Sequence, residues 1–279
     1  MEDLDLDFVT EPEKKAVYDP EVARTFFRSC GTTVKAVKDG TLFAEQAPGD
    51  KMYFIAAGEI TLSAGGKNID VLRDGEIIGE MSAIIGTPRT ATAVARTDCI
   101  LIGMSREQFF DALQKQPEFA LMLMRMILSR LRLALSMLRI RGGLPSNDKG
   151  KLGRVLDNRL LKAIAVSLPK AAHNRFAKDR PVLVEGGTGS VMYIVLEGGV
   201  SISIKGAVVE TIGVGGIFGE MALVDDAPRA ASATATSDCT LLAIDRASFM
   251  ELVKSNPDFG AELLRNLSER LRYLNSQRK

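Results

Sequence analysis

Residues 79–92 read GEMSAIIGTPRTAT, and residues 219–232 read GEMALVDDAPRAAS. The offset of 140 residues between these stretches continues without a gap from about Phe43 and Leu183 to about Arg132 and Arg272. Solenoid repeats have periods of about 20 to 50 residues, whereas a unit of this length can bury a hydrophobic core of its own. The repeat therefore predicts two domains of the same fold in tandem.

The composition outside the repeated segments predicts where the domains begin and end. Residues 142–153 read GGLPSNDKGKLG, which is typical of a helix stop followed by a linker. The chain starts with MEDLDLDFVTEPEKK, which is acidic and lacks the basic start and apolar core of a signal peptide. We expect a flexible acidic segment at 1–20, a first domain with a long C-terminal helix at 21–142, a linker at 143–153 and a second domain at 154–279.

Each copy reads as a series of short strands followed by a helix. The first copy has β-favouring segments punctuated by glycine, such as MYFIAAG at 52–58, and the second repeats them, with MYIVLEG at 192–198. The pattern becomes helical at Ser105 in the first copy and at Asp245 in the second. Many short strands with glycine turns predict a mainly β fold, with two tandem β-jelly-roll domains that are each flanked by helices.

Charge and cysteine content limit the classes of partner and compartment. The 36 basic and 35 acidic residues give a net charge of +1, which provides no general field for nucleic acid or an anionic membrane. Of the three cysteines, Cys99 and Cys239 occupy equivalent repeat positions in apolar runs, and Cys30 stands apart. Buried free thiols in a reducing cytoplasm fit this pattern. We therefore expect a cytoplasmic protein with no nucleic acid or membrane partner.

The repeated motif combines the groups that hold a phosphate. Gly79 and Gly219 let the backbone approach a ligand where a Cβ atom would clash, and the next residues can begin a short helix whose N–H groups point at an anion. Arg89 and Arg229 complete the site because a guanidinium can bond two phosphate oxygens in one plane. The small residues after each arginine leave room for the ligand and keep backbone donors open; they are Thr90, Ala91, Ala230 and Ala231.

The glutamate of each motif indicates a second group on the same ligand. Glu80 and Glu220 lie nine residues before the arginine, where a carboxylate would repel a phosphate. The carboxylate suits a neutral hydroxyl that donates to it, such as a ribose 2′-OH. A cyclic nucleotide is a compact ligand that carries both groups side by side. A single Glu and Arg at this spacing would usually form an exposed ion pair, but two copies in the same frame favour ligand sites.

In the predicted jelly rolls, this motif resembles the phosphate-binding cassette of the cyclic nucleotide-binding domain family. That family includes protein kinase A regulatory subunits, cyclic-nucleotide-gated channels and the bacterial catabolite activator. The resemblance covers about residues 30 to 275 and implies that Glu220 holds the ribose 2′-OH and Arg229 the cyclic phosphate, assisted by the N–H groups of Ala222 and Ala230. The expected contact residues are Gly79, Glu80, Met81, Ser82, Arg89, Thr90 and Ala91 in the first cassette and Gly219, Glu220, Met221, Ala222, Arg229, Ala230 and Ala231 in the second.

Three of the differences between the two cassettes bear on ligand binding. Ile78 stands where the second copy has the family's usual Phe218, and Ser82-Ala83 replaces the usual Ala-Leu. Thr90 replaces Ala230 directly after the arginine. In this family a hydroxyl at that position can bond guanine, although some cAMP receptors carry it too. The resemblance therefore implies cAMP as the ligand and leaves cGMP open at the first site.

The segment 118–141 is expected to form an amphipathic helix. Arginines separate its apolar residues, which have 3-4-3-4 spacing at Leu121, Met124, Leu128, Leu131, Leu135 and Leu138. So many arginines exclude a membrane span. The stripe fits packing on the helix's own barrel and also a two-stranded coiled coil, and we expect a homodimer through this helix. Arg130 and Arg270, each 41 residues after its cassette arginine, either cap the nucleotide or face solvent.

Catalytic and metal-binding chemistry has little support in the sequence. The single histidine, His173, has no partner at metal-ligand spacing and leaves serine or cysteine nucleophiles without a histidine base. No Walker, kinase or zinc motif is present, and the glycine-rich GGTGS at 186–190 is interpreted as a hairpin turn. The sequence therefore predicts a non-enzymatic cyclic nucleotide receptor that acts on an unidentified protein partner. The alternative is an interaction scaffold that keeps the fold but signals without nucleotide.

Overall fold

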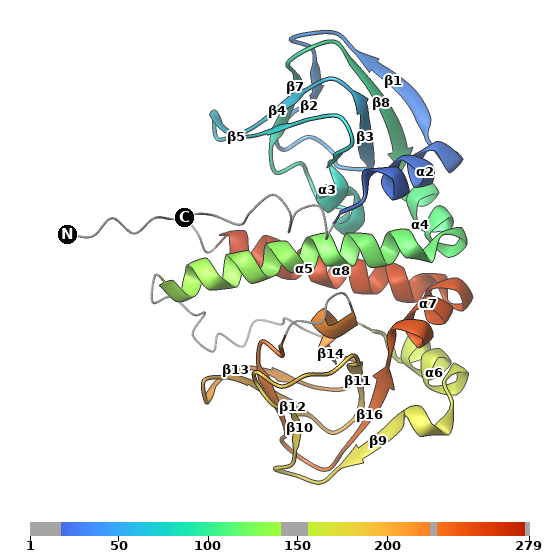
Figure 1. Ribbon diagram of the computed structural model, residues 1–279, viewed down its shortest axis with the longest axis vertical. Coiled ribbons are helices and arrows are strands. Elements are labelled where there is room, and N and C mark those ends of the chain that lie inside the picture. The colour runs from blue at the N-terminus through green and yellow to red at the C-terminus, as the bar shows by residue number, and fades with distance from the viewer. Residues whose placement is uncertain (1–17, 141–155, 224–227, 277–279) are drawn as a thin grey trace, which may run out of the picture. The chain divides into compact units, whose positions relative to one another are not determined.

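The computed structural model describes residues 18–140, 156–223 and 228–276, and the chain divides into two compact units, residues 1–112 and 113–279 (Figure 1). The long helix α5 (Pro117–Ile140) groups with the second unit, whereas the domain limits expected from the sequence place it at the end of the first domain. The expected linker at 143–153 and most of the expected acidic segment at 1–20 lie outside the described residues.

The first unit contains two four-stranded antiparallel sheets. One has the order β1 (Thr32–Ala36), β8 (Cys99–Ser105), β3 (Lys51–Ala57) and β6 (Ile77–Ile78), and the other has β2 (Thr41–Phe43), β7 (Thr92–Ala95), β4 (Ile60–Ala64) and β5 (Lys67–Leu72). Inward side chains of both sheets form one core, which includes Ile55, Leu101, Ile60 and Ala93. The helices beside these sheets in the chain are α2 (Pro20–Cys30), α3 (Glu80–Ile85) and α4 (Arg106–Lys115).

The second unit repeats this arrangement. One of its sheets has the order β14 (Ile217–Phe218), β11 (Met192–Glu197), β16 (Cys239–Ile244) and β9 (His173–Phe176). The other sheet has the order β10 (Pro181–Leu183), β15 (Ser232–Ala235), β12 (Val200–Ile204) and β13 (Ala207–Ile212). Besides α5, its helices are α6 (Asn158–Ser167), η1 (Lys170–Ala172), η2 (Glu220–Leu223), α7 (Arg246–Ser255) and α8 (Pro257–Ser276). The prediction of two tandem jelly rolls flanked by helices is confirmed.

Aspartate caps fix where several helices begin. The Asp245 side chain accepts a hydrogen bond of 2.8 Å from the backbone N–H of Ser248, and this bond holds the pKa of Asp245 below its usual value. Asp157 caps α6 in the same way, through the N–H of Leu160 at 2.8 Å. Such caps satisfy N–H groups that have no partner inside the helix. The expected change from strand to helix at Asp245 is therefore confirmed.

The sequence-based interpretation differs from the structure in two details. Strands β1 and β9 were not predicted, and neither were β6 and β14, which are two residues long and too short to show a period. The predicted hairpin at 186–190 is wrong, because β10 pairs with β15 while β11 pairs with β14 and β16. This segment joins strands of different sheets. The three cysteines are free, as predicted, and Cys99 and Cys239 are buried.

Helix α5 packs along α8 within the second unit (Figure 1). The described part of the apolar stripe on α5 is buried, at Leu121, Met124, Leu128 and Leu131. The equivalent positions on α8 are also buried, at Ala261, Leu264, Ser268 and Leu271. The stripe expected to face a second copy is thus covered within one chain, while the side chains of Leu135 and Leu138 lie outside the described ones. In the described ranges, no helix combines the length and apolar content that a bilayer crossing needs.

Candidate functional site

Each cassette is built around a glycine in the left-handed conformation. Gly79 has φ 81° and precedes α3, and Gly219 has φ 74° and precedes η2. A Cβ atom on Gly79 would lie 2.5 Å from Nη1 of Arg89, and one on Gly219 would lie 3.1 Å from Nη1 of Arg229. The sequence suggested that these glycines make room for a ligand. The structure shows that they make room for the arginine of the same motif.

The first cassette buries its arginine almost completely. Arg89 is 3% exposed and donates from Nη1 to the carbonyl of Gly79 at 3.0 Å and from Nη2 to the carbonyl of Lys51 at 2.6 Å. Its Nε is buried and has no hydrogen-bond partner among the described residues. The guanidinium is therefore held in place by carbonyl groups that only partly satisfy it.

In the second cassette, the same two nitrogens of the arginine bond the equivalent backbone carbonyls. Arg229 is 8% exposed and donates from Nη1 to the carbonyl of Gly219 at 3.0 Å and from Nη2 to the carbonyl of Val191 at 2.9 Å. Its Nε is also buried without a partner in the described part of the chain. The same unusual arrangement of an arginine in two units indicates a role beyond packing.

Burial disfavours the charged form of both guanidinium groups. Desolvation lowers the pKa of Arg89, against the opposing influence of Tyr53, Asp50 and Glu80. It also lowers the pKa of Arg229, against Tyr193 and Glu220. Neither arginine forms an ion pair with a carboxylate among the residues that the structure describes. A buried cation with an unused N–H group is stabilised by an anion that can bond it directly.

The loop before each cassette completes the frame around the arginine. In the second unit, the N–H of Gly186 donates to the carbonyl of Arg229 at 2.9 Å, and the N–H of Arg229 donates to the carbonyl of Gly187 at 2.8 Å. A Cβ atom on Gly189 would lie 2.6 Å from Nη2 of Arg229. In the first unit Gln46 and Ala47 make the same pair of backbone bonds to Arg89. The glycine-rich loop therefore belongs to the site, which the sequence interpretation missed.

The two motif glutamates are buried, as an internal ligand site requires. Glu80 follows Gly79 at the start of α3, and Glu220 follows Gly219 at the start of η2. Oε1 of Glu220 lies 3.4 Å from Nη1 of Arg270 on α8. Arg270 is 14% exposed and turns toward the cassette, and its role as a cap on the nucleotide stays a prediction. Arg130 is exposed on α5.

An aromatic pair lines each site, but its members come from different strands. Phe43 of β2 stacks on Tyr53 with ring centroids 6.4 Å apart, and the guanidinium carbon of Arg89 lies 4.2 Å from the centre of the Phe43 ring. In the second unit, Phe218 of β14 stacks on Tyr193 at 5.4 Å. The departure at Ile78 is thus compensated by Phe43. Sequence comparison of single positions could not show this, because the compensating residue lies on another strand.

The remaining predicted contact residues surround the glutamate and arginine. Met81, Ser82, Met221 and Ala222 lie on α3 and η2, whereas Thr90, Ala91, Ala230 and Ala231 follow the arginines. Thr90 and Ala230 are exposed and so are accessible to a ligand. The N–H of Ala222, expected to assist the ligand, instead donates to the carbonyl of Gly219 at 3.2 Å. Nε of Arg132 on α5 lies 3.4 Å from Sδ of Met221, which brings a side chain of α5 to the second cassette.

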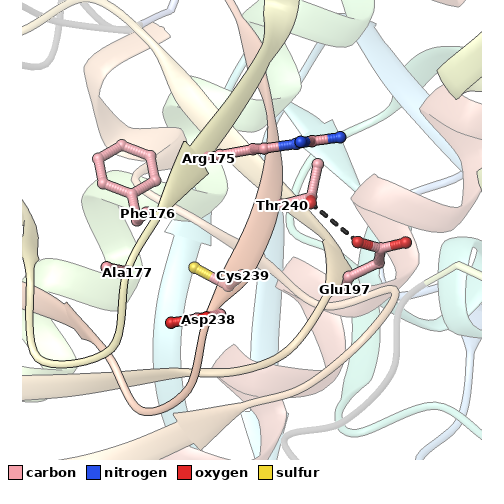
Figure 2. A pocket seen from close by; sticks show the side chains of 7 residues that line it. All are labelled: Arg175, Phe176, Ala177, Glu197, Asp238, Cys239 and Thr240. Atoms are coloured by element: carbon pink, nitrogen blue, oxygen red, sulfur yellow. Dashed lines mark hydrogen bonds between the residues drawn. The ribbon is translucent and has the colours of Figure 1, made fainter.

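A hollow of about 490 Å³ in the second unit has no comparable chemistry (Figure 2). Its lining includes Cys239, whose thiol pKa is raised by burial, and Thr240, whose hydroxyl donates to Glu197 at 2.9 Å. A protonated thiol is a poor nucleophile. Within the described ranges, no group of three or more His, Cys, Asp or Glu side chains could hold a metal ion. The cassettes therefore remain the candidate sites.

Comparison with known proteins points to the same two regions. The profile of the cyclic nucleotide-binding domain matches residues 33–116 and 173–256. The chain is 27% identical over 206 residues to a cAMP-dependent protein kinase regulatory subunit of Eremothecium gossypii, covering 74% of this chain and 40% of that protein. It is 26% identical over 211 residues to a cGMP-dependent protein kinase of Toxoplasma gondii, covering 75% of this chain and 19% of that protein.

A solved structure of the regulatory domain of Toxoplasma gondii PKA with cAMP also matches. The identity is 22% and the TM-score 0.31, over 90% of this chain and 96% of that one. The chain spans less than half the length of the two curated relatives described above.

Proposed function

The chain belongs to the cyclic nucleotide-binding domain family, and we propose that it is a non-catalytic receptor that binds cAMP at both cassettes. The observation that supports this most directly is the pair of buried guanidinium groups, 3% and 8% exposed, that are held by backbone carbonyls and have no carboxylate partner among the described residues. A cyclic phosphate supplies the missing negative charge and hydrogen-bond acceptors. Glu80 and Glu220 then accept from the ribose 2′-OH beside it.

The output of such a receptor passes to another protein. The similar proteins named above are a cAMP-dependent protein kinase regulatory subunit and a cGMP-dependent protein kinase, which supports a regulatory role and a protein partner. A pulldown from cell extract with and without cAMP identifies that partner and the direction of the effect. Recovery of the same proteins in both conditions would favour the alternative, an interaction scaffold that does not respond to nucleotide.

Binding of cAMP is expected to raise the melting temperature of the protein. A ligand that binds only the folded state stabilises it by about 2.7 kcal/mol at a hundredfold excess over Kd. The measurement is a melting scan with and without cAMP on protein first shown to be free of nucleotide. Adenosine, which lacks the phosphate that the arginines would bind, serves as the control ligand. No shift at millimolar cAMP would contradict the receptor function.

Thr90 is expected to widen base choice at the first site. Its hydroxyl lies directly after Arg89 and is exposed, whereas the equivalent Ala230 offers no such group. Replacing Thr90 with alanine should therefore reduce cGMP binding relative to cAMP at that site, and Ala230→Thr should increase it at the other. Competition binding measures both ratios. A ratio that changes by less than about twofold, about 0.4 kcal/mol, would show that Thr90 does not select the base.

A further inference from the structure

Arg270 of α8 joins two carboxylates in the second unit. Its Nη1 lies 3.4 Å from Oε1 of Glu220, and its Nη2 lies 3.4 Å from Oε1 of Glu210 on β13. The exposed fractions of the three side chains are 14% for Arg270, 9% for Glu220 and 23% for Glu210. Glu210 is thus linked through one arginine to the acceptor that the proposed function assigns to the ribose.

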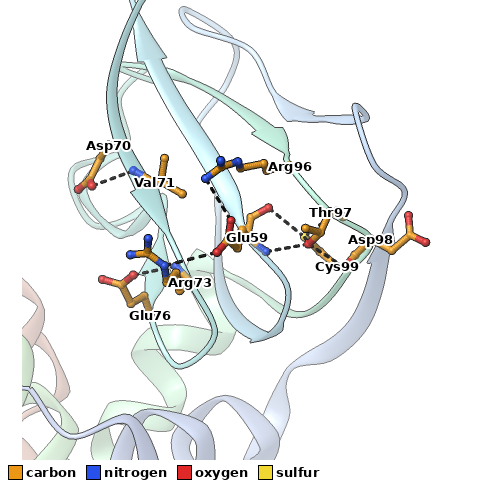
Figure 3. Close-up of polar contacts among 9 residues, drawn as sticks. All are labelled: Glu59, Asp70, Val71, Arg73, Glu76, Arg96, Thr97, Asp98 and Cys99. Atoms are coloured by element: carbon orange, nitrogen blue, oxygen red, sulfur yellow. Dashed lines mark hydrogen bonds and ion pairs between the residues drawn. The ribbon is translucent and has the colours of Figure 1, made fainter.

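The equivalent residue of the first unit makes a different contact. Asp70 occupies the position of Glu210 in the repeat, and its carboxylate accepts a hydrogen bond of 2.8 Å from the N–H of its neighbour Val71 (Figure 3). Asp70 is exposed and is one methylene shorter than Glu210. The first unit therefore keeps the negative charge at this position in solvent, whereas the second unit brings it into the charged cluster.

The charges of the second cluster balance before any ligand arrives. Arg229 and Arg270 contribute two positive charges, and Glu220 and Glu210 contribute two negative ones. Arg229 and Glu220 each contact the ligand in the proposed function, on which this inference rests. Glu210 instead neutralises Arg270, which would otherwise attract an anion. We propose that Glu210 sets the affinity of the second site by weakening its attraction for the anionic nucleotide, and that protonation of Glu210 relieves this effect.

The surroundings of Glu210 raise the pKa of its carboxyl above the usual value of a glutamate. Burial raises the pKa of Glu210, Arg270 opposes this rise, and Glu220 adds to it. Among the described residues, Arg270 and Glu220 are the charged groups that influence this pKa, and the residue opposite Glu210 on β12 is the uncharged Ile202. A bound anion favours the protonated carboxyl, so ligand binding is coupled to proton uptake. Affinity should therefore rise as the pH falls through the raised pKa and be lowest above it.

The Glu210→Gln variant tests this because it removes the charge and keeps the shape. Calorimetry with cAMP at pH 7.5 and 5.5 is compared for wild type, Glu210→Gln and the matched control Asp70→Asn, each in an Arg89→Ala background that isolates the second site. One charge at this range is worth about three- to tenfold in affinity. We expect Glu210→Gln to bind about three- to tenfold more tightly at pH 7.5, with little further gain at pH 5.5. Wild type and Asp70→Asn should gain affinity at the lower pH.

Each result has one meaning. Unchanged or weaker binding by Glu210→Gln at pH 7.5 would overturn the inference and make Glu210 a residue that positions Arg270. A wild-type chain that binds no cAMP at either site would instead contradict the proposed function itself. If the Arg89→Ala background fails to fold, the same comparison is made with an otherwise wild-type chain and a two-site fit. Melting scans of each variant without ligand separate loss of folding from loss of binding.

Discussion

Replacing Arg229 with alanine is expected to weaken cAMP binding at the second site by about 2 to 5 kcal/mol, because the phosphate loses its buried charged partner. Arg229 is the best-placed cation for this role: it is 8% exposed, two of its nitrogens are held by carbonyl groups, and its Nε is unused among the described residues. Calorimetry on the purified variant measures the loss. Unchanged affinity at that site would mean that the phosphate binds elsewhere.

Matched variants separate this effect from general damage. Arg89→Ala removes the equivalent side chain of the first unit and should spare the second site. Arg272→Ala removes an exposed arginine of α8 and should spare both. Glu220→Ala should cost less than Arg229→Ala, since it removes the acceptor of a neutral hydroxyl. A melting scan without ligand is needed for each variant, because Arg229 also bonds the carbonyls of Gly219 and Val191.

The fold and the Glu–Arg pair of each site could be predicted because the sequence features that indicate them are short motifs or occur twice in the chain. The 140-residue offset showed the duplication, and glycine-punctuated short strands indicated jelly rolls. The nine-residue spacing of Glu80 and Arg89 pointed to one ligand with a phosphate and a hydroxyl. The structure places Gly79 and Arg89 in direct contact through a hydrogen bond of 3.0 Å, so the motif behaves as a unit.

The features that could not be predicted depend on pairings between distant residues. Phe43 takes the place that Phe218 has in the other unit, and Glu210 meets Arg270 across 60 residues of sequence. Periodicity shows that a side chain is buried but does not show which element covers it. For the same reason the stripe on α5 indicated a packing surface correctly, while its partner within the chain, α8, could only be seen in the structure.

Because α5 packs on α8, a charged residue in the apolar stripe of α5 is expected to destabilise the folded chain. Leu128 lies on α5 and is 1% exposed, so Leu128→Asp would place a carboxylate in an apolar interior. Loss of a buried leucine alone costs about 2 to 5 kcal/mol, and an unpaired buried charge adds to this. We expect a loss of about 4 kcal/mol or more in the free energy of unfolding. Leu133→Asp makes the same chemical change on the same helix at a position that is 45% exposed, and should change stability by about 0.5 kcal/mol.

Denaturant unfolding followed by circular dichroism, together with light scattering, distinguishes this outcome from the homodimer expected from the sequence. If α8 covers the stripe in solution, wild type is a monomer and Leu128→Asp lowers the unfolding midpoint far more than Leu133→Asp does. If the stripe joins two copies instead, wild type has twice the monomer mass, and Leu128→Asp halves that mass while each chain stays folded. Because Leu121, Met124, Leu128 and Leu131 are already buried within one chain, we expect the first result. A folded Leu128→Asp monomer from a dimeric wild type would contradict it.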